Sequence, residues 1–342
     1  MRFLSSFRRS PAPEGSPAVV SDSSFENFLG WNFRAETSVD PAEGAPVTTV
    51  FHSRLSDRTV ERIGERISQT PGLSEGFAGT EGDHRLRELL RLGTHLLPEE
   101  LERETGLIPF DPPADVHAMV RESIYCGDLF YNDMMVAALE RAGTPVGENW
   151  RVLDFGCSSG RCIWPFSKAY PRTRCFGCDP IGGAVEWAAA HLPGIDFHQS
   201  PEKPPLRYAD ESFDFVFAIS IWSHFGRGAG AAWRREMRRI LRPGGLFLWT
   251  THGPGALRHY CESGAVRMSD GERFFRELHR DGFSFYNPFG ERGDWGIVSE
   301  EWGQAFLHPS HVLREALDGW KVLDYRSRHV ENNQDLWLFE KR

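Results

Sequence analysis

The chain has 342 residues, of which 40% are hydrophobic and 25% charged, as in a globular protein with one large domain or a core plus an accessory domain. Its net charge of −9 argues against a general nucleic-acid binder and leaves room only for a local basic patch, because no basic surplus is available to neutralise phosphates. No apolar run approaches the ~20 residues of a membrane span, and the apolar part of the basic N-terminus is too short for a signal peptide. We therefore expect a cytoplasmic protein that binds neither nucleic acid nor membrane.

The N-terminal third is expected to hold a tail followed by helices. Residues 1–20 include a stretch rich in Pro, Ser, Ala and Gly, which predicts a disordered tail. Apolar residues then recur at helical spacing, so we assign residues 21–112 to a mostly helical accessory region, with one short strand at Val47–Phe51. The pair Pro112-Pro113 is the best boundary in this part of the chain, and residues 113–342 are assigned to the main domain.

A short apolar run followed by a glycine-spaced turn organises the main domain. Residues 114–141 predict two helices broken near Cys126–Asp128, and they lead directly into this run. Val152–Phe155 predicts a buried parallel strand, and Gly156 and Gly160 allow the backbone to approach a ligand closely. A strand, a glycine turn and a helix start with hydroxyls near its N-terminus together predict a nucleotide-type site.

Strands and helices alternate from this point, which predicts a doubly wound sheet. The predicted strands are Val152–Phe155, Arg174–Cys178, Asp196–His198, Phe213–Ile219 and Gly245–Thr250, with helices at Gly160–Ala169, Gly183–His191 and Ala231–Ile240. Two closing strands, at Trp320–Tyr325 and Gln334–Glu340, are joined by a short polar segment and predict an antiparallel hairpin. The expected fold class is therefore α/β, a doubly wound, Rossmann-like, mostly parallel seven-stranded sheet with an antiparallel C-terminal hairpin.

A long insertion, residues 252–318, separates the fifth strand from that hairpin. It is rich in aromatic residues, and a segment of this length is not expected to be structureless. We interpret it as a lid or substrate-recognition insertion. Most of its aromatic side chains are expected to form a small core of their own, and a few to line an acceptor pocket.

Two acidic residues narrow the kind of ligand. The dinucleotide fingerprint needs G-x-G-x-x-G, whereas three residues here separate Gly156 from Gly160. Asp154, just before the first glycine, repels a pyrophosphate and favours an ammonium or a ribose hydroxyl. Asp179 ends the next strand about 25 residues later, near the offset at which such sites place a ribose-binding carboxylate.

The order of these motifs resembles that of the class I S-adenosylmethionine-dependent methyltransferases of the small-molecule type. The resemblance covers about residues 150–250, including the helix, Pro-Gly-Gly turn and strand at residues 237–248. It implies S-adenosylmethionine as cofactor, with Asp179 on the ribose and Asp154 toward the methionine part. The cofactor-binding residues it implies are Asp154, Gly156, Cys157, Ser158, Gly160, Asp179, Pro180, Gln199, Ser200, Pro201, Ser220 and Ile221. Gln199, Ser200 and Pro201 are expected to lie beside the adenine ring, and Glu202 is the alternative contact.

Methyl transfer from a sulfonium is an in-line displacement, so holding the acceptor in line supplies much of the rate. A hydroxyl acceptor also benefits from a general base, a task that suits histidine near neutral pH. His224, which follows the fourth strand, is the first candidate, and His252, directly after the fifth, is the second. For each, the alternative is a capping or packing role.

We predict an enzyme that methylates a small-molecule acceptor, specifically an oxygen of a sugar-bearing or secondary-metabolite intermediate, and we allow for a homodimer. The alternatives are a nicotinamide-dependent oxidoreductase and a non-catalytic cofactor-binding protein with a methyltransferase core. No metal is expected, because the Cys175–Cys178 pair lacks a second pair, and His308 and His311 lack a carboxylate cluster.

Overall fold

The computed structural model describes residues 44–70, 72–109, 112, 113, 116, 124–293, 299–316, 318–330 and 333–342. The tail predicted at residues 1–20 lies outside these ranges. The main sheet consists of β1 (Arg151–Phe155), β2 (Arg174–Asp179), β3 (Asp196–Gln199), β4 (Phe213–Ala218), β5 (Leu241–Thr251), β8 (Trp320–Val330) and β9 (Gln334–Lys341).

These seven strands lie in the order β3-β2-β1-β4-β5-β9-β8. The first five are parallel to one another, whereas β9 runs antiparallel to both β5 and β8. The predicted doubly wound, mostly parallel sheet with an antiparallel C-terminal hairpin is therefore confirmed. The central strands could be recognised in the sequence because residues such as Leu153, Phe215 and Phe247 are fully buried, as expected when both faces of a sheet are covered.

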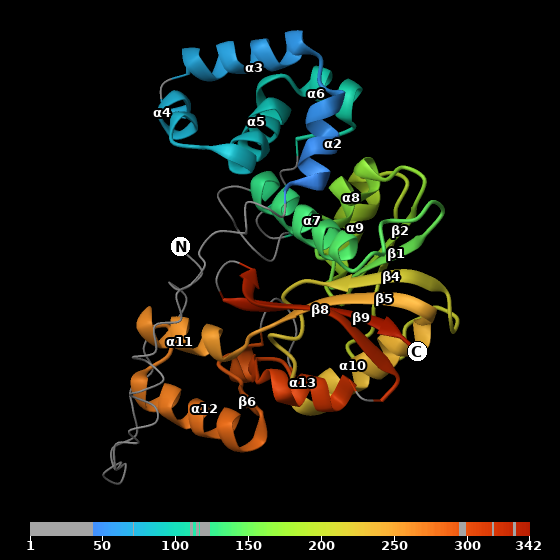
Figure 1. Ribbon diagram of the computed structural model, residues 1–342, viewed down its shortest axis with the longest axis vertical. Coiled ribbons are helices and arrows are strands. Elements are labelled where there is room, and N and C mark those ends of the chain that lie inside the picture. Colours follow the sequence, from blue (N-terminus) through green and yellow to red (C-terminus); the bar gives the residue numbers. More distant parts are fainter. Residues whose placement is uncertain are drawn as a thin grey trace.

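Helices cover both faces of the sheet (Figure 1). One layer consists of α7 (Ile124–Arg141), α8 (Ile163–Ala169) and α9 (Gly182–His191), and the other of α10 (Arg227–Ile240) and α13 (Pro309–Ala316). The predicted helix break near Cys126–Asp128 is wrong, because α7 runs continuously through these residues. A glycine inside a helix costs only about 1 kcal/mol, and burial of the helix from Leu129 to Leu139 outweighs that cost.

The described part of the N-terminal region, which begins at residue 44, is helical. Its helices are α2 (Pro46–Arg54), α3 (Asp57–Gln69), α4 (Leu73–Ala78), α5 (Gly82–Leu96) and α6 (Pro98–Thr105). The strand predicted at Val47–Phe51 is wrong, because this segment forms part of α2. Pro46 suits the first turn of a helix, and Val47 and Phe51, four residues apart, are fully buried on one face. Tertiary packing has therefore overridden the strand preference of the β-branched residues.

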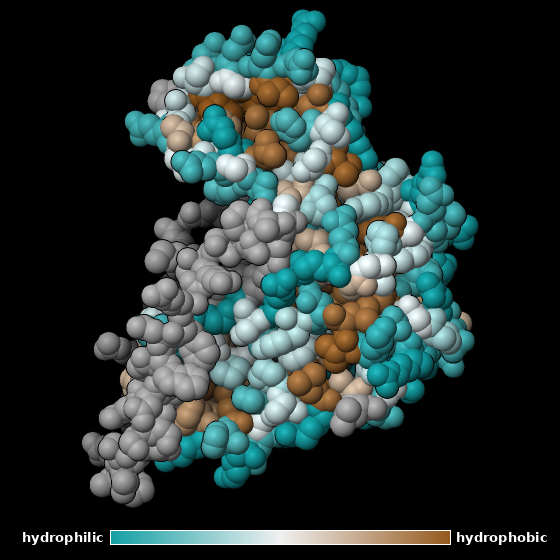
Figure 2. Space-filling model, in the orientation of Figure 1, coloured by the Kyte–Doolittle hydropathy of each residue, from teal (hydrophilic) through white to brown (hydrophobic). Residues whose placement is uncertain are grey.

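These helices share one hydrophobic core with α7, α8 and the sheet. Ile63 of α3 and Leu90 of α5 belong to the same cluster as Met135 of α7 and Phe166 of α8. Figure 2 shows apolar residues gathered between the N-terminal helices, over this part of the core. The domain boundary at residues 112 and 113 stays a prediction.

A buried polar contact fastens α2 to α7. The carboxylate of Asp133 accepts hydrogen bonds from Thr48 N at 2.8 Å, from Thr48 Oγ1 at 2.6 Å and from Arg87 Nε at 2.8 Å. The side chains of Asp133 and Arg87 are 2% and 8% exposed, so this ion pair is almost fully removed from water. Burial raises the pKa of Asp133, against the opposing effects of Arg87 and Thr48.

The insertion contains α11 (Pro254–Glu262), α12 (Met268–Asp281), β6 (Phe283–Tyr286), the 3-10 turn η2 (Gly290–Arg292), β7 (Gln304–Leu307) and α13. β6 and β7 form a separate two-stranded antiparallel sheet. Leu257, Phe274 and Phe306 lie in a small core that belongs to the insertion, as predicted for its aromatic residues, whereas Phe283 and Phe285 pack against the main core. Its role as a lid or substrate-recognition element stays a prediction.

Candidate functional site

The predicted cofactor residues come together at the carboxyl edge of the parallel strands. Asp179, the last residue of β2, pairs in register with Gln199 of β3, and Asp154 of β1 lies between Gly177 and Phe217. Open α/β sheets bind ligands outside this edge, where the strand order reverses between β1 and β4.

The glycine turn after β1 is bonded to the end of β2. Gly156 N and Cys157 N donate to Cys178 O at 2.8 and 3.1 Å, and Ser158 N donates to Asp179 Oδ2 at 2.8 Å. Ser158 has φ +47°, a left-handed conformation that costs a non-glycine residue about 1–2 kcal/mol. The turn is therefore held in a strained shape by its contact with Asp179.

The two glycines accommodate side chains of the protein itself. A Cβ on Gly156 would lie 2.2 Å from Ile221 Cδ1, and a Cβ on Gly160 would lie 2.7 Å from Leu192 Cδ1. Both glycines also have φ +82°. That they make room for a cofactor stays a prediction, and the buried Cys157 side chain packs beneath the turn beside Gly177.

Two neighbouring carboxyl groups dominate the electrostatics of this edge. Burial, and next the charge of Asp179, raise the pKa of Asp154 well above its ordinary value, while Arg161 acts in the opposite direction. Burial also raises the pKa of Asp179 to about 6, although Ile181 N and Ser158 N donate to its two oxygens at 2.9 and 2.8 Å. A cation or a hydroxyl donor bound beside these groups would be favoured.

Helix α7 contributes to this electrostatic setting. Arg161 Nε lies 2.7 Å from Asp128 Oδ1, and neither side chain is more than 5% exposed. Because Arg161 is paired with Asp128, and Asp128 itself raises the pKa of Asp154, the arginine only partly offsets the buried charge of the turn.

A buried hydroxyl suggests how a ligand would fit. The Oγ atom of Ser158 is inaccessible to solvent and has no hydrogen-bond partner among the described residues. Buried polar atoms normally have a partner, so a ligand that carries hydroxyl or amino groups would satisfy this one. Together with the carboxylates of Asp154 and Asp179, it suits the ribose and amino-acid parts of S-adenosylmethionine.

The segment after β3 is fixed by its own contacts. Gln199 Nε2 donates to Pro180 O at 2.8 Å, and Ser200 N donates to Asp179 O at 2.9 Å. Ser200 is buried, whereas Gln199 and Pro201 are exposed. The structure thus brings these residues beside Asp179, and their contact with an adenine ring stays a prediction.

His224 is oriented by the insertion. Its Nδ1 atom lies 2.8 Å from the carbonyl oxygen of Gly303, and its ring stacks on Trp302 with centroids 4.9 Å apart at 27°. A carbonyl oxygen only accepts hydrogen bonds, so Nδ1 must carry the proton, and in the neutral ring Nε2 is then the basic nitrogen. The sequence did not indicate that Trp302 and Gly303 contact His224, because nothing local links these residues.

The loop after β4 and the insertion are joined by backbone pairing. Three hydrogen bonds of 2.8 Å connect residues 223–226 with residues 301–305. They run from Gly303 N to His224 O, from Ala305 N to Ser223 O and from Gly226 N to Glu301 O. Glu301 Oε2 also accepts from Ala229 N at 2.9 Å and so caps α10. The base candidate therefore stands on a rigid support.

His252 is less suited to proton transfer. It is 3% exposed, and burial, followed by the nearby His224, lowers its pKa to about 3. Its Nε2 atom lies 3.1 Å from the hydroxyl of Tyr260, and the rings of the two candidate histidines are 6.3 Å apart. A group with so low a pKa is a weak base near neutral pH, which favours a packing role.

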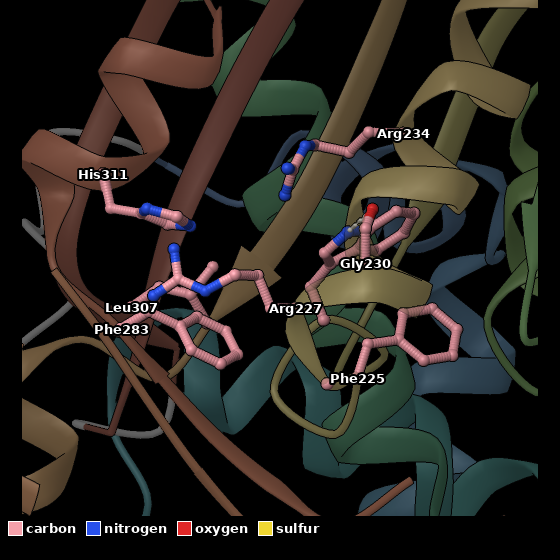
Figure 3. A pocket seen from close by; sticks show the side chains of 9 residues that line it. Phe225, Arg227, Gly230, Arg234, Phe283, Leu307 and His311 are labelled. Atoms are coloured by element: carbon pink, nitrogen blue, oxygen red, sulfur yellow. Dashed lines mark hydrogen bonds between the residues drawn. The ribbon is translucent and has the colours of Figure 1, made fainter. Parts of the chain in front are cut away.

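A small cavity lies between α10, which supplies Arg227, Gly230 and Arg234, and the side chains of Phe283, Leu307 and His311 (Figure 3). Arg227, Arg234 and His311 are directed toward one another there, and Glu315 pairs with both Arg234 and His311. Its volume of about 10 Å³ is about the space of a single water molecule, so it cannot hold an acceptor.

The described part of the chain lacks two further features, a metal-binding cluster and a membrane-spanning helix. No group of three or more His, Cys, Asp or Glu residues is placed there to hold a metal ion. Within the same ranges, no helix has both the length and the apolar character needed to cross a bilayer.

The strand order, the acid and glycine turn after β1 and the carboxylate after β2 define a class I S-adenosylmethionine-dependent methyltransferase domain. In agreement, residues 152–245 match the family model of the methyltransferase domain. For this matched domain, the prediction of an S-adenosylmethionine-dependent methyltransferase is confirmed. The match also speaks against a nicotinamide-dependent oxidoreductase.

Curated relatives cover part of the chain. The malonyl-[acyl-carrier protein] O-methyltransferase of Hahella chejuensis is 29% identical over 119 residues, which are 34% of this chain and 40% of that protein. The secondary metabolism regulator laeA of Monascus pilosus is 28% identical over 230 residues, 63% of this chain and 50% of that protein. The chain thus spans half or less of the length of these relatives.

Solved structures are more distant. A SAM-dependent methyltransferase from Aquifex aeolicus is 14% identical, with 60% of this chain and 87% of that chain covered at a TM-score of 0.37. The [4+2]-cyclase SpnF is 16% identical, with 66% and 83% covered at a TM-score of 0.43. The class assignment therefore comes from the strand order and the matched domain.

Proposed function

We propose that the protein transfers a methyl group to an oxygen of a small-molecule acceptor, with His224 as the general base. The observation that carries this proposal is the 2.8 Å contact between His224 Nδ1 and the Gly303 carbonyl oxygen, which leaves Nε2 as the basic nitrogen. When bound, S-adenosylmethionine supplies a methyl group activated by a sulfonium. The residues of the chain then have to bind the cofactor, orient the acceptor and remove the acceptor's proton.

Each part of this task has a candidate residue. Asp179 holds the ribose hydroxyls, and Asp154 offsets the cofactor's positive charge from beneath the turn. Ser158 offers its buried hydroxyl to the ligand. His224 accepts the acceptor's proton at Nε2, and the pairing of residues 301–305 with its loop keeps the ring in place.

The nature of the acceptor is inferred from charge and from the relatives. The net charge of −9 disfavours nucleic acid as a substrate. The names of the relatives include an O-methyltransferase and a regulator of secondary metabolism, which supports an oxygen acceptor and a secondary-metabolite intermediate. Assembly as a homodimer stays a prediction.

The test compares His224→Gln with His191→Gln, an exposed histidine on α9. Release of S-adenosylhomocysteine is measured against a panel of hydroxylated aromatic and sugar-bearing compounds, and cofactor binding is measured by calorimetry. We expect His224→Gln to bind the cofactor normally and to lose about 10²–10⁴-fold in turnover, whereas His191→Gln stays unchanged. Unchanged turnover of His224→Gln across pH would refute the role of His224. If the protein binds the cofactor but releases no S-adenosylhomocysteine with any compound of the panel, the non-catalytic alternative is favoured.

A further inference from the structure

A closed ring of hydrogen bonds joins three strands at the carboxyl end of β4. Ser220 N donates to Thr250 Oγ1 at 2.8 Å, and Thr250 Oγ1 donates to Gln334 Oε1 at 2.6 Å. Gln334 Nε2 then donates to Ser220 Oγ at 2.5 Å and closes the ring. Thr250 is fully buried, Gln334 is 5% exposed and Ser220 is partly exposed.

The donors and acceptors of this ring run in one direction. The Thr250 oxygen accepts from Ser220 N, and its single proton goes to the carbonyl oxygen of Gln334. If the Gln334 amide were turned over, Thr250 Oγ1 would face two donors, Ser220 N and Gln334 Nε2. The buried Thr250 proton would then lose its partner in the ring. A buried hydroxyl proton without a partner costs about 1–3 kcal/mol, so the stated orientation is favoured.

This direction determines what Ser220 presents to the binding edge. Its oxygen already accepts from Gln334, so its own proton points out of the ring and is available to a ligand. Ser220 also has φ +61°, a left-handed conformation that the ring helps to maintain. The side chain of the next residue, Ile221, packs against Gly156, so the backbone that carries Ser220 leads directly to the glycine turn.

We propose that Gln334 is a positioning residue that fixes the Ser220 hydroxyl as a hydrogen-bond donor to the carboxylate of the methionine part of the cofactor. A carboxylate oxygen of the cofactor suits this position because the Ser220 hydroxyl, which already accepts from Gln334, can still donate one hydrogen bond. A carboxylate there also suits the neighbouring Asp154, since the ammonium on the same carbon would face an acid. The proposal rests on the cofactor site of the proposed function but not on His224.

The test uses Ser220→Gly, Gln334→Glu and the double variant. Ser220→Gly removes the hydroxyl and suits the left-handed backbone, so it is expected to fold. Gln334→Glu keeps the shape but, when ionised, offers only acceptors, which turns the Ser220 proton inward. Ser263→Gly, at an exposed serine after α11, is the matched control.

Calorimetry measures binding of S-adenosylmethionine and of its decarboxylated analogue, which keeps the ammonium and lacks the carboxylate. We expect each single variant to weaken S-adenosylmethionine binding about 10- to 100-fold, as for a lost hydrogen bond to a charged group. Binding of the decarboxylated analogue should change less than about threefold, and the double variant should bind no more weakly than Ser220→Gly. The Ser263→Gly control should match the wild type.

Three results would overturn the proposal. Equal weakening for both ligands would show that the ring supports the turn without contacting a carboxylate. Additive losses in the double variant would show that Gln334 does not act through Ser220. Unchanged affinity in both single variants would place Ser220 away from the cofactor. Because binding is measured without an acceptor, the outcome does not depend on whether His224 is a base.

Discussion

The substitution Arg87→Met should destabilise the protein strongly, because it leaves the buried carboxylate of Asp133 without its cation. Arg87 and Asp133 are 8% and 2% exposed, and removing one partner of such a pair costs about 3–5 kcal/mol. Thr48 still donates two hydrogen bonds to the carboxylate, so we expect the lower end, about 3 kcal/mol. For a chain of this size that corresponds to a drop of about 4 °C in Tm.

The assay is urea unfolding at several pH values, with Arg172→Met as the control. Arg172 pairs with Glu148 at an exposed site, where loss of a partner costs less than about 1 kcal/mol. The pKa of Asp133 is already raised by burial and should rise further in Arg87→Met. The deficit should therefore be largest at high pH, where this carboxyl is ionised, and should shrink as the pH falls through its pKa.

A double variant, Arg87→Met with Asp133→Leu, removes the stranded charge and should recover part of the lost stability. The reasoning fails if Arg87→Met costs no more than Arg172→Met. It also fails if the double variant is less stable than the single one, because the cost would then lie in packing and not in charge.

Three further predictions concern the binding edge and the hairpin. Asp179→Asn should weaken S-adenosylmethionine binding about 10- to 100-fold in calorimetry, since a carboxylate that accepts ribose hydroxyls is lost; an unchanged Kd would remove Asp179 from the site. Burial raises the pKa of Asp179 and of Asp335 to about 6, so the stability they contribute is present below pH ~4 and is lost as the pH rises through about 6. As the pH rises over that range, ionisation of each carboxyl should lower the free energy of unfolding by up to about 3 kcal/mol. Urea unfolding at pH 4.5 and at pH 7 should therefore show a smaller loss of stability between the two pH values for Asp335→Asn than for the wild type. Ser158→Gly should raise the thermal stability of the ligand-free protein by about 1 kcal/mol by relieving its left-handed strain, and a fall in Tm would contradict this.

The central sheet could be predicted because its signals are local. β1, β2 and β4 are short apolar runs bounded by breakers, and Asp179 ends its strand at the offset expected for a ribose-binding acid. The hairpin was equally readable, since two apolar runs are joined by a short polar segment.

Errors arose where long-range packing decides a local conformation. Val47–Phe51 has β-branched residues, yet Pro46 and burial against α7 make it helical. Gly127 suggested a break, yet α7 continues through it. The contacts that hold the site residues could not be predicted for the same reason. Gly303 lies 79 residues from His224, and Gln334 lies 114 residues from Ser220, so no spacing in the sequence could link them.

The pairing of residues 223–226 with residues 301–305 sets limits on building chimeras. Exchanging residues 252–318 for the insertion of a relative would separate His224 from the Gly303 carbonyl that holds its ring. The donor segment would also have to supply a carboxylate cap for α10 in place of Glu301. The loop after β4 and the insertion should therefore be taken from the same protein and grafted together.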